Sequence, residues 1–200
     1  MIYFQVFSCG LLSLLFSLSA MAQIDCAADS DAVANVLLDP QANNSPANPY
    51  INQRHVFCGE VRNNAGKGFH ARPGGQDPIL VEGEGAARVT GQLAPSVQYP
   101  GVYRGDDVQV RQVVGPWVNK QPPYSTFFPD HCSQAQVVAS IGYAYSQNPR
   151  QVAGAFNGPS APILGAQTHC TGTAGEVLQL RGYLNLIGGT WILNTAYPLP

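Results

Sequence analysis

The sequence has little charge: Asp, Glu, Lys and Arg make up 11 % of its 200 residues, and lysine occurs only twice. Ten basic and twelve acidic side chains give a formal net charge of -2, so no overall positive charge attracts the chain to nucleic acid, and a site for a polyanion must be local. The hydrophobic content of 45 % excludes an intrinsically disordered chain, and the low charge excludes a long coiled coil. No internal repeat is present, so the length indicates one globular domain, rich in turns, with 21 Gly and 16 Pro.

The first 22 residues carry no charged side chain. The run from Leu11 to Leu18 is almost entirely Leu, Phe and Ser, and it leads to the small-residue ending Ala20-Met21-Ala22. This pattern predicts a secretory signal peptide, residues 1–22, cleaved before Gln23. A membrane anchor is the alternative, but the apolar run is shorter than the roughly 20 residues that a span needs, and no basic flank follows it. We therefore expect a secreted or periplasmic protein without a stable membrane anchor.

Four cysteines follow this segment: Cys26, Cys58, Cys132 and Cys170. An even number of cysteines in an exported chain predicts two disulfides. Three pairings are possible, and we favour the one that joins neighbours along the chain, Cys26 with Cys58 and Cys132 with Cys170. As an alternative, the adjacent pairs His131-Cys132 and His169-Cys170 supply a set of four zinc ligands. Adjacent side chains point apart, and zinc ligands usually lie two to four residues apart, so disulfides are the preferred interpretation.

Hydrophobic spacing predicts two helices. One covers Asp29 to Leu38, where acidic residues precede apolar side chains at helical spacing. The other covers Ser133 to Ser146, with Ser133 as its N-cap and Pro149 just beyond its end. The first helix and the Asn- and Pro-rich loop after it form an N-terminal segment, residues 23–50, ahead of the main domain, residues 51–200.

Strands are predicted mainly late in the chain. Val56 to Val61 and Gly68 to Ala71 are expected to be short strands, with Asn63-Asn64-Ala65-Gly66 as the turn of a hairpin. The alternating valines of Asp107 to Val114 predict another strand, and three short strands with a turn at Gly188-Gly189 are expected over residues 176–196. Two other stretches are predicted to be mainly loop: Gly74 to Gly105 and Gly154 to Gly175. This order indicates an α+β domain rather than repeated βαβ units.

Two of the four histidines, His55 and His70, lie in one short tract that also holds local positive charge. Four of the ten basic residues fall in it, opposed only by Glu60: Arg54, Arg62, Lys67 and Arg72. Two imidazoles that titrate near neutrality can act as general base and general acid at once, and basic neighbours can hold a phosphate. The tract therefore indicates phosphodiester chemistry. The alternative is a pair of structural histidines beside a solvated charged face.

Longer motifs follow one another along the chain. The first is His55-x-x-Cys58-Gly59-Glu60-Val61, followed by Gly68-Phe69-His70 and Arg72-Pro73-Gly74-Gly75-x-Asp77-Pro78. The second is Lys120 with Ser125-Thr126-Phe127-Phe128-Pro129-Asp130, and the third is Thr195-Ala196-Tyr197-Pro198. In this order, from about Asn52 to Pro200, the motifs resemble those of the bacterial EndoU-type endoribonucleases.

The resemblance implies an EndoU-like α+β fold in which antiparallel sheets flank an active-site cleft. It also implies an endoribonuclease that prefers uridine, in which the ribose 2′-OH attacks the adjacent phosphate and leaves 2′,3′-cyclic phosphate and 5′-OH ends. That reaction needs one proton taken and one given. We expect His70 to be the base, His55 the acid, and Lys120 the cation that stabilises the transition state.

Five further residues are expected to bind the RNA: Lys67, Ser125, Thr126, Thr195 and Tyr197. Lys67 would contact a phosphate from the hairpin. Thr195 and Tyr197 lie two apart on a predicted strand, so both side chains face the same side, and the resemblance implies that together they hold one uracil. Six other residues are predicted to be structural: Trp117, Phe127, Phe128, Trp191, His131 and His169.

The acidic residues are scattered, so no metal site is predicted and we expect cleavage without a metal cofactor, with manganese left open as an activator. The expected partners are RNA and, for a toxin of this family, an immunity protein; the small size favours a monomer. Two alternatives from other classes stay open. One is a catalytically inert RNA- or anion-binding module, which a Lys120 side chain far from both histidines would favour. The other is a small structural protein stabilised by disulfides or zinc.

Overall fold

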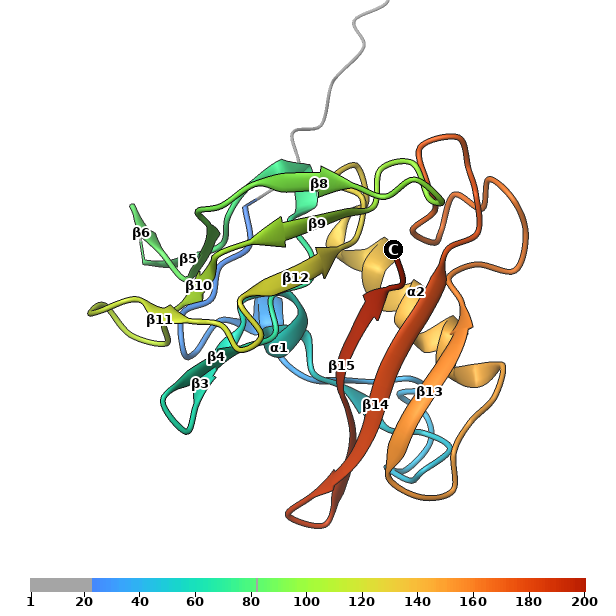
Figure 1. Ribbon diagram of the computed structural model, residues 1–200. Helices are drawn as coiled ribbons and strands as arrows, with labels where there is room; N and C mark the ends of the chain where they lie inside the picture. The colour runs from blue at the N-terminus through green and yellow to red at the C-terminus, as the bar shows by residue number, and fades with distance from the viewer. Residues whose placement is uncertain (1–22, 82) are drawn as a thin grey trace, which may run out of the picture.

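The computed structural model describes residues 23–81 and 83–200, and the predicted signal peptide lies outside these residues. The elements are few helices and mostly antiparallel strands, so the predicted α+β class is confirmed. Figure 1 shows the long strands beside the longest helix on one side of the molecule and the short strands grouped on the other. No helix among the described residues is long and apolar enough to span a bilayer.

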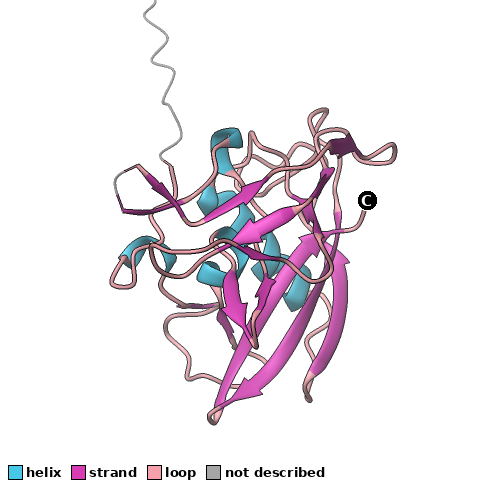
Figure 2. Cartoon of the chain, turned by 60° about the vertical axis from the view of Figure 1, so that its left-hand side comes forward, coloured by secondary structure: helices cyan, strands magenta, loops and turns pink. Residues whose placement is uncertain are grey.

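The largest sheet has five strands in the order β1-β2-β15-β14-β13. Its long strands lie side by side in Figures 1 and 2. The bounds of the five strands are Val36–Leu37 (β1), Tyr50–Ile51 (β2), Gly154–Pro159 (β13), Gln179–Ile187 (β14) and Thr190–Pro198 (β15). β14 and β15 form a hairpin with the predicted turn at Gly188-Gly189, where both residues have positive φ, a conformation that glycine adopts without steric cost. β2 pairs in parallel with β15 and so joins the beginning of the domain to its end.

Helix α2, Gln134–Ser146, packs on β13 and β14. It begins as predicted, with a capping box in which the Gln136 N–H donates to Ser133 Oγ and the Ser133 N–H donates to the Gln136 side chain. Gly158 of β13 lies against the helix, and a Cβ there would come within 2.1 Å of Ala144 O. This close approach brings helix and sheet together around the main hydrophobic core, which includes Ile141 and Tyr145.

Short strands form two three-stranded sheets, β11-β10-β7 and β12-β9-β8. Their bounds are Ala87–Val89 (β7), Leu93–Pro95 (β8), Tyr103–Asp106 (β9), Val108–Val110 (β10), Val118–Asn119 (β11) and Tyr124–Phe127 (β12). The two-stranded pair of β5 (Ile79–Val81) and β6 (Glu84–Gly85) and the 3₁₀ turn η2 (Pro73–Gly75) precede them. These strands enclose a second, smaller core: Phe69, Ala87, Tyr103, Val108, Val110 and Phe127. Phe69 reaches this core from the segment that carries His70.

The early helix and strand predictions are partly wrong. Asp29 to Leu38 contains only the 3₁₀ turn η1 (Asp31–Val33) and strand β1, because pairing of β1 with β2 outweighs the local helical spacing. Val56 to Val61 is not one strand: the chain forms helix α1 (Gln53–Phe57) and then β3 (Glu60–Arg62). The hairpin itself is confirmed, since β3 and β4 (Ala65–Lys67) are joined by Asn63-Asn64 with both residues at positive φ.

Later strand predictions also need correction. Gly68 to Ala71 is not a strand, and only Val108–Val110 of the segment Asp107 to Val114 is one. The segments predicted as loop contain β5 to β8, the beginning of β9, and β13. Strands of two or three residues are too short to show an alternation of apolar side chains, and β13 (Gly-Ala-Phe-Asn-Gly-Pro) has only one large apolar residue. The three strands expected over residues 176–196 are two long ones.

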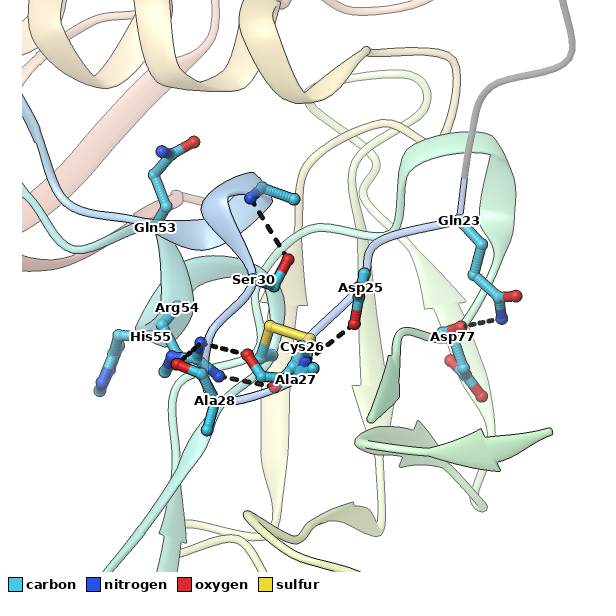
Figure 3. The surroundings of a disulfide bond; sticks show 12 residues. Gln23, Asp25, Cys26, Ala27, Ala28, Ser30, Gln53, Arg54, His55 and Asp77 are labelled. Atoms are coloured by element: carbon cyan, nitrogen blue, oxygen red, sulfur yellow. Dashed lines mark hydrogen bonds between the residues drawn. A yellow bond between two sulfur atoms is a disulfide. The ribbon is translucent and has the colours of Figure 1, made fainter. Parts of the chain in front are cut away.

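Both preferred disulfides are present, with Cα atoms 5.9 Å apart in Cys26–Cys58 and 5.3 Å apart in Cys132–Cys170. The zinc alternative is therefore wrong, because its two cysteines are bonded to each other. Cys26–Cys58 joins the N-terminal segment to the end of α1 (Figure 3). Arg54 of that helix strengthens the link, since its guanidinium donates to the carbonyls of Cys26 and Ala27, each at 2.7 Å.

Loss of either disulfide is expected to destabilise the fold. The bonded cysteines lie 32 and 38 residues apart, for which loop-closure entropy predicts about 3–4 kcal/mol per disulfide. Replacing Cys26 and Cys58 together by Ala, and Cys132 and Cys170 in a second variant, should each lower the free energy of unfolding by that amount in a urea titration. A loss below about 1 kcal/mol for either pair would contradict this expectation.

Candidate active site

A cavity of about 880 Å³ lies between β14 and β15 on one side and β12 with the β3–β4 hairpin on the other. All eight residues predicted to act on or bind RNA line it: His55, Lys67, His70, Lys120, Ser125, Thr126, Thr195 and Tyr197. They come from α1, β4, β12, β15 and the segments between these elements. The tertiary structure thus brings together motifs from the beginning, middle and end of the domain.

Backbone hydrogen bonds hold the two histidines together. At the end of α1 the carbonyls of His55 and Val56 accept from the N–H groups of Phe69 and His70, at 2.8 and 2.7 Å. Gly68 makes this approach possible, because its φ is +75° and a Cβ there would come within 2.2 Å of His55 O. His70 is thereby attached to the helix that carries His55.

His70 has the hydrogen bonding of a base. Its Nδ1 lies 3.1 Å from Thr126 O, and because a carbonyl only accepts, Nδ1 carries the proton and Nε2 keeps its lone pair. Burial of the ring, followed by the positive charges of Lys120 and His55, holds the pKa of His70 well below its usual range. The ring is therefore neutral near pH 7 and able to accept a proton at Nε2.

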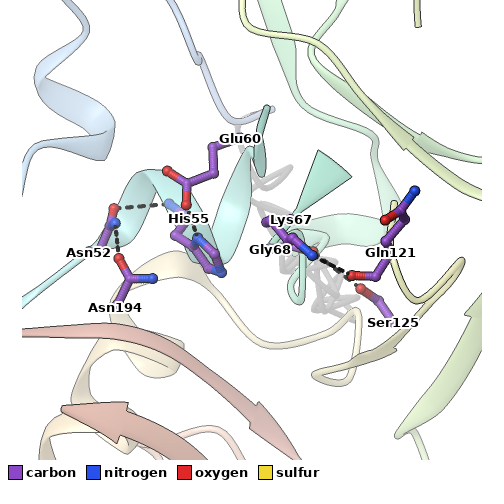
Figure 4. Close-up of polar contacts among 8 residues, drawn as sticks. All are labelled: Asn52, His55, Glu60, Lys67, Gly68, Gln121, Ser125 and Asn194. Carbon is purple, nitrogen blue, oxygen red and sulfur yellow. Dashed lines mark hydrogen bonds and ion pairs between the residues drawn. The ribbon is translucent and has the colours of Figure 1, made fainter. Parts of the chain in front are cut away.

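His55 has the opposite partner, a carboxylate. Its Nδ1 lies 2.9 Å from Glu60 Oε1 (Figure 4). The hydrogen bond from His55 is the largest cause of the lowered pKa of Glu60, so the carboxylate is ionised and accepts the Nδ1 proton. With Nδ1 bound to this carboxylate, Nε2 is the ring atom of His55 that is left to exchange a proton with a substrate.

Glu60 was not among the predicted site residues. The sequence held a signal for it, since it is the only acid in the basic tract and follows His55 by five residues. Only the chain reversal from α1 into β3 turns this spacing into a contact. Asn52 is a second addition: its Oδ1 accepts from the His55 N–H at 3.0 Å as the N-cap of α1, and its Nδ2 donates to Asn194 Oδ1 on β15 (Figure 4).

The two imidazole rings lie close enough to act on one group. Their centroids are 6.4 Å apart, with 30° between the ring planes. Both rings line the same cavity, so one bound group can contact both of them. The Tyr197 ring also stacks on His70, and the centroids of these two rings are 5.0 Å apart.

Lys120 is buried and lines the same cavity as both histidines. Its ammonium donates to Ser125 Oγ, and Ser125 donates in turn to Gly68 O at 3.2 Å. Burial, and after it the charge of Lys67, lowers the pKa of Lys120 to about 7. Ser125 was expected to bind the substrate directly. Because Ser125 is 1 % exposed and accepts from the Lys120 ammonium, its contacts instead favour a role in positioning that ammonium.

The remaining predicted residues lie around this centre. Lys67 donates from Nζ to Gln121 O at 2.9 Å, which ties the hairpin to the segment that follows Lys120 (Figure 4). Thr126 lines the cavity, and its backbone carbonyl holds His70. Thr195 faces the same cavity as Tyr197, and its Oγ1 is buried without a hydrogen-bond partner among residues 23–81 and 83–200.

The residues predicted to be structural lie outside the cavity. Phe127 and Phe128 are fully buried, and Trp191 packs against the main core. Trp117 differs from its prediction as a core residue: it is half-buried between two arginines, with the guanidinium carbons of Arg88 and Arg111 lying 4.2 and 4.4 Å from its ring. Within the part of the chain that the structure describes, no group of three or more His, Cys, Asp or Glu side chains forms a metal site.

Lys120 is expected to make stability rise with pH. Its pKa is about 7 in the folded protein and near its ordinary value of 10.5 in the unfolded chain, so between these values the unfolded chain binds more protons. The free energy of unfolding should therefore increase by about 2 kcal/mol from pH 7 to pH 9. Urea titrations at both pH values test this, with Lys120→Met as the variant that lacks the increase. Equal pH dependence of the two proteins would contradict the lowered pKa.

Comparison with known proteins gives one match. The sequence model described as bacterial EndoU nuclease matches residues 49–200, a region that contains every residue lining the cavity. No curated protein and no solved structure matches the chain. Because the family match covers well over half of the sequence, the chain belongs to the bacterial EndoU nuclease family.

Proposed function

We propose that this member of a nuclease family is an exported endoribonuclease that cleaves single-stranded RNA at uridine by attack of the ribose 2′-OH on the adjacent phosphate. The observation that carries the proposal is the contrast between the two neighbouring imidazoles: Nδ1 of His70 donates to a carbonyl, and Nδ1 of His55 donates to a carboxylate. One ring is thus suited to take a proton and the other to give one, as the reaction requires.

In the proposed reaction His70 Nε2 takes the proton of the 2′-OH while the 2′ oxygen attacks phosphorus. The bond from phosphorus to the 5′ oxygen breaks, and His55 Nε2 gives its proton to that leaving oxygen. The products are a 2′,3′-cyclic phosphate and a 5′-OH. The Lys120 ammonium, held by Ser125, would stabilise the additional negative charge on the phosphorane oxygens.

The preference for uridine is proposed from Thr195 and Tyr197. The Thr195 hydroxyl, which has no partner in the described chain, can both donate to and accept from a pyrimidine edge. The Tyr197 ring stacks on His70, the proposed general base, and is suited to packing against the sugar or the nucleobase of the substrate. Lys67 at the hairpin would contact a neighbouring phosphate.

The proposal includes no metal cofactor, because two imidazoles and an ammonium supply both proton transfers and the charge; manganese would act only as an activator. Two disulfides support an oxidising compartment, periplasmic or extracellular. A toxin role, an immunity protein as inhibitor and a monomeric state are further expectations. The inert binding module loses the observation that would have favoured it, since Lys120 lies in the cavity with both histidines.

Cleavage of an oligoribonucleotide with a single uridine, in EDTA, tests the proposal. The wild-type protein should give cyclic phosphate and 5′-OH ends, and His55→Ala and His70→Ala should each lower the rate by about 10²–10⁴-fold. His131→Ala, a change of an exposed histidine outside the cavity, should keep the wild-type rate. Replacing the uridine by deoxyuridine should abolish cleavage, because the nucleophile is removed. Intact RNA at every protein concentration, with and without manganese, would overturn the nuclease proposal for this chain.

The separate roles of the two histidines can be distinguished with an activated substrate. Uridine 3′-(p-nitrophenyl phosphate) has a leaving group that needs no proton, so His55→Ala should cleave it at nearly the wild-type rate. His70→Ala should stay impaired by about 10²–10⁴-fold on this substrate as on RNA. The reverse pattern, measured by release of p-nitrophenolate, would exchange the two assignments.

A further inference from the structure

A tyrosine and an arginine form an exposed stacked pair at the edge of the cavity. Tyr124 on β12 lines the cavity and is 39 % exposed, and the guanidinium carbon of Arg104 on β9 lies 4.0 Å from its ring centroid. In the antiparallel register Thr126 opposes Arg104 and Tyr124 opposes Asp106, so these side chains share one face of the β12-β9-β8 sheet. That face continues directly into the cavity at Thr126.

The pair has unused binding capacity. Arg104 is about half exposed, and its Nε donates to Asp106 Oδ1 at 2.8 Å. Among residues 23–81 and 83–200 its two terminal nitrogens make no hydrogen bond, and neither does the Tyr124 hydroxyl. The arginines at Trp117 differ in this respect. Arg88 and Arg111 both stack on the Trp117 ring, and a terminal nitrogen of Arg111 donates to Glu84.

The position of the pair separates it from the reacting groups. Tyr124 is the residue before Ser125, which holds the Lys120 ammonium, while Tyr197 stacks on His70 from the opposite wall. Both residues line the cavity, but Ser125 is 1 % exposed and Tyr124 39 %, so the Tyr124 ring is the one open to solvent. The cavity, about 880 Å³, is at the upper end of the range for sites that hold one drug-sized ligand, so it has room for more than a single nucleotide.

We propose that Tyr124 and Arg104 form a subsite for the nucleotide next to the cleaved uridine, with its base stacked on the Tyr124 ring and its phosphate bound by the free guanidinium nitrogens of Arg104. The inference rests on the proposed function, because it places RNA in the cavity. An aromatic ring accepts any base without sequence preference, and a guanidinium matches the geometry of a phosphate. The subsite thus adds affinity for an RNA chain while the choice of uridine stays with the opposite wall.

Binding of a fluorescent oligonucleotide, RNA except for one deoxyuridine, tests the subsite without relying on catalysis. Tyr124→Ala should weaken binding about tenfold, since stacking of one base contributes about 1–3 kcal/mol, and Tyr124→Phe should bind like the wild type. Arg104→Gln should reduce the slope of log K against log salt concentration by about 0.7, the value for one phosphate contact on a single strand. Arg88→Gln is the matched control, an arginine stacked on an aromatic ring outside the cavity, and should change neither quantity.

Abasic nucleotides identify the base that Tyr124 contacts. On oligonucleotides with an abasic site on one or the other side of the deoxyuridine, the penalty of Tyr124→Ala should vanish for one of them and persist for the other. The subsite would be overturned if Tyr124→Ala weakened the binding of all oligonucleotides equally, or did not weaken the binding of the intact one. If Tyr124→Ala does not fold, the salt dependence of Arg104→Gln decides, and an unchanged slope would overturn the subsite. Failure of the wild type to cleave the all-RNA version would instead overturn the proposed function, while binding still decides the subsite.

Discussion

The last carbonyls of a helix have no partner within the helix, and in α1 two of them are satisfied by the segment that carries the second histidine. A helix of five residues is too short to be stable alone, so this contact stabilises α1 as well as joining His55 to His70. Phe69, which supplies one of the two N–H donors, is fully buried in the smaller core. The joint therefore cannot open without exposing apolar surface, and the spacing of the two imidazoles is set by backbone and core together.

The two histidines are the same side chain, but different groups accept their Nδ1 protons. At His70 the acceptor is the neutral carbonyl of Thr126, and burial of the ring, followed by the charges of Lys120 and His55, lowers the pKa of this side chain. At His55 the acceptor is the ionised carboxylate of Glu60. The contrast arises because β12 passes His70 with its backbone, whereas β3 presents the side chain of Glu60 to His55. In the proposed reaction, the acid and base roles would therefore be set by the neighbouring strands, since the two side chains themselves are the same.

The cavity concentrates positive charge in a protein whose net charge is -2. Lys67, Lys120 and Arg62 all line it, with Glu60 as the carboxylate bound to His55. Keeping Lys120 and His70 buried opposes folding, because desolvation disfavours their charged forms. The packing of α2 on the long strands and the Cys132–Cys170 disulfide compensate for this cost away from the cavity, and Cys26–Cys58 does so at the end of α1.

Features that depend on neighbours a few residues away could be predicted from the sequence, and so could the family motifs. Helix α2 was predictable because its capping box and apolar spacing lie within one segment, and the hairpin turn because Asn63-Asn64 and the strands beside it are adjacent. The eight candidate residues were found through motifs whose order is readable without a structure. Only the tertiary structure decided the short strands, since β1 and β13 form through partners far along the chain. It likewise decided the contacts of Glu60, Ser125 and Tyr124, because hydrogen bonds and stacking depend on distances of a few ångströms that the packing of distant elements sets.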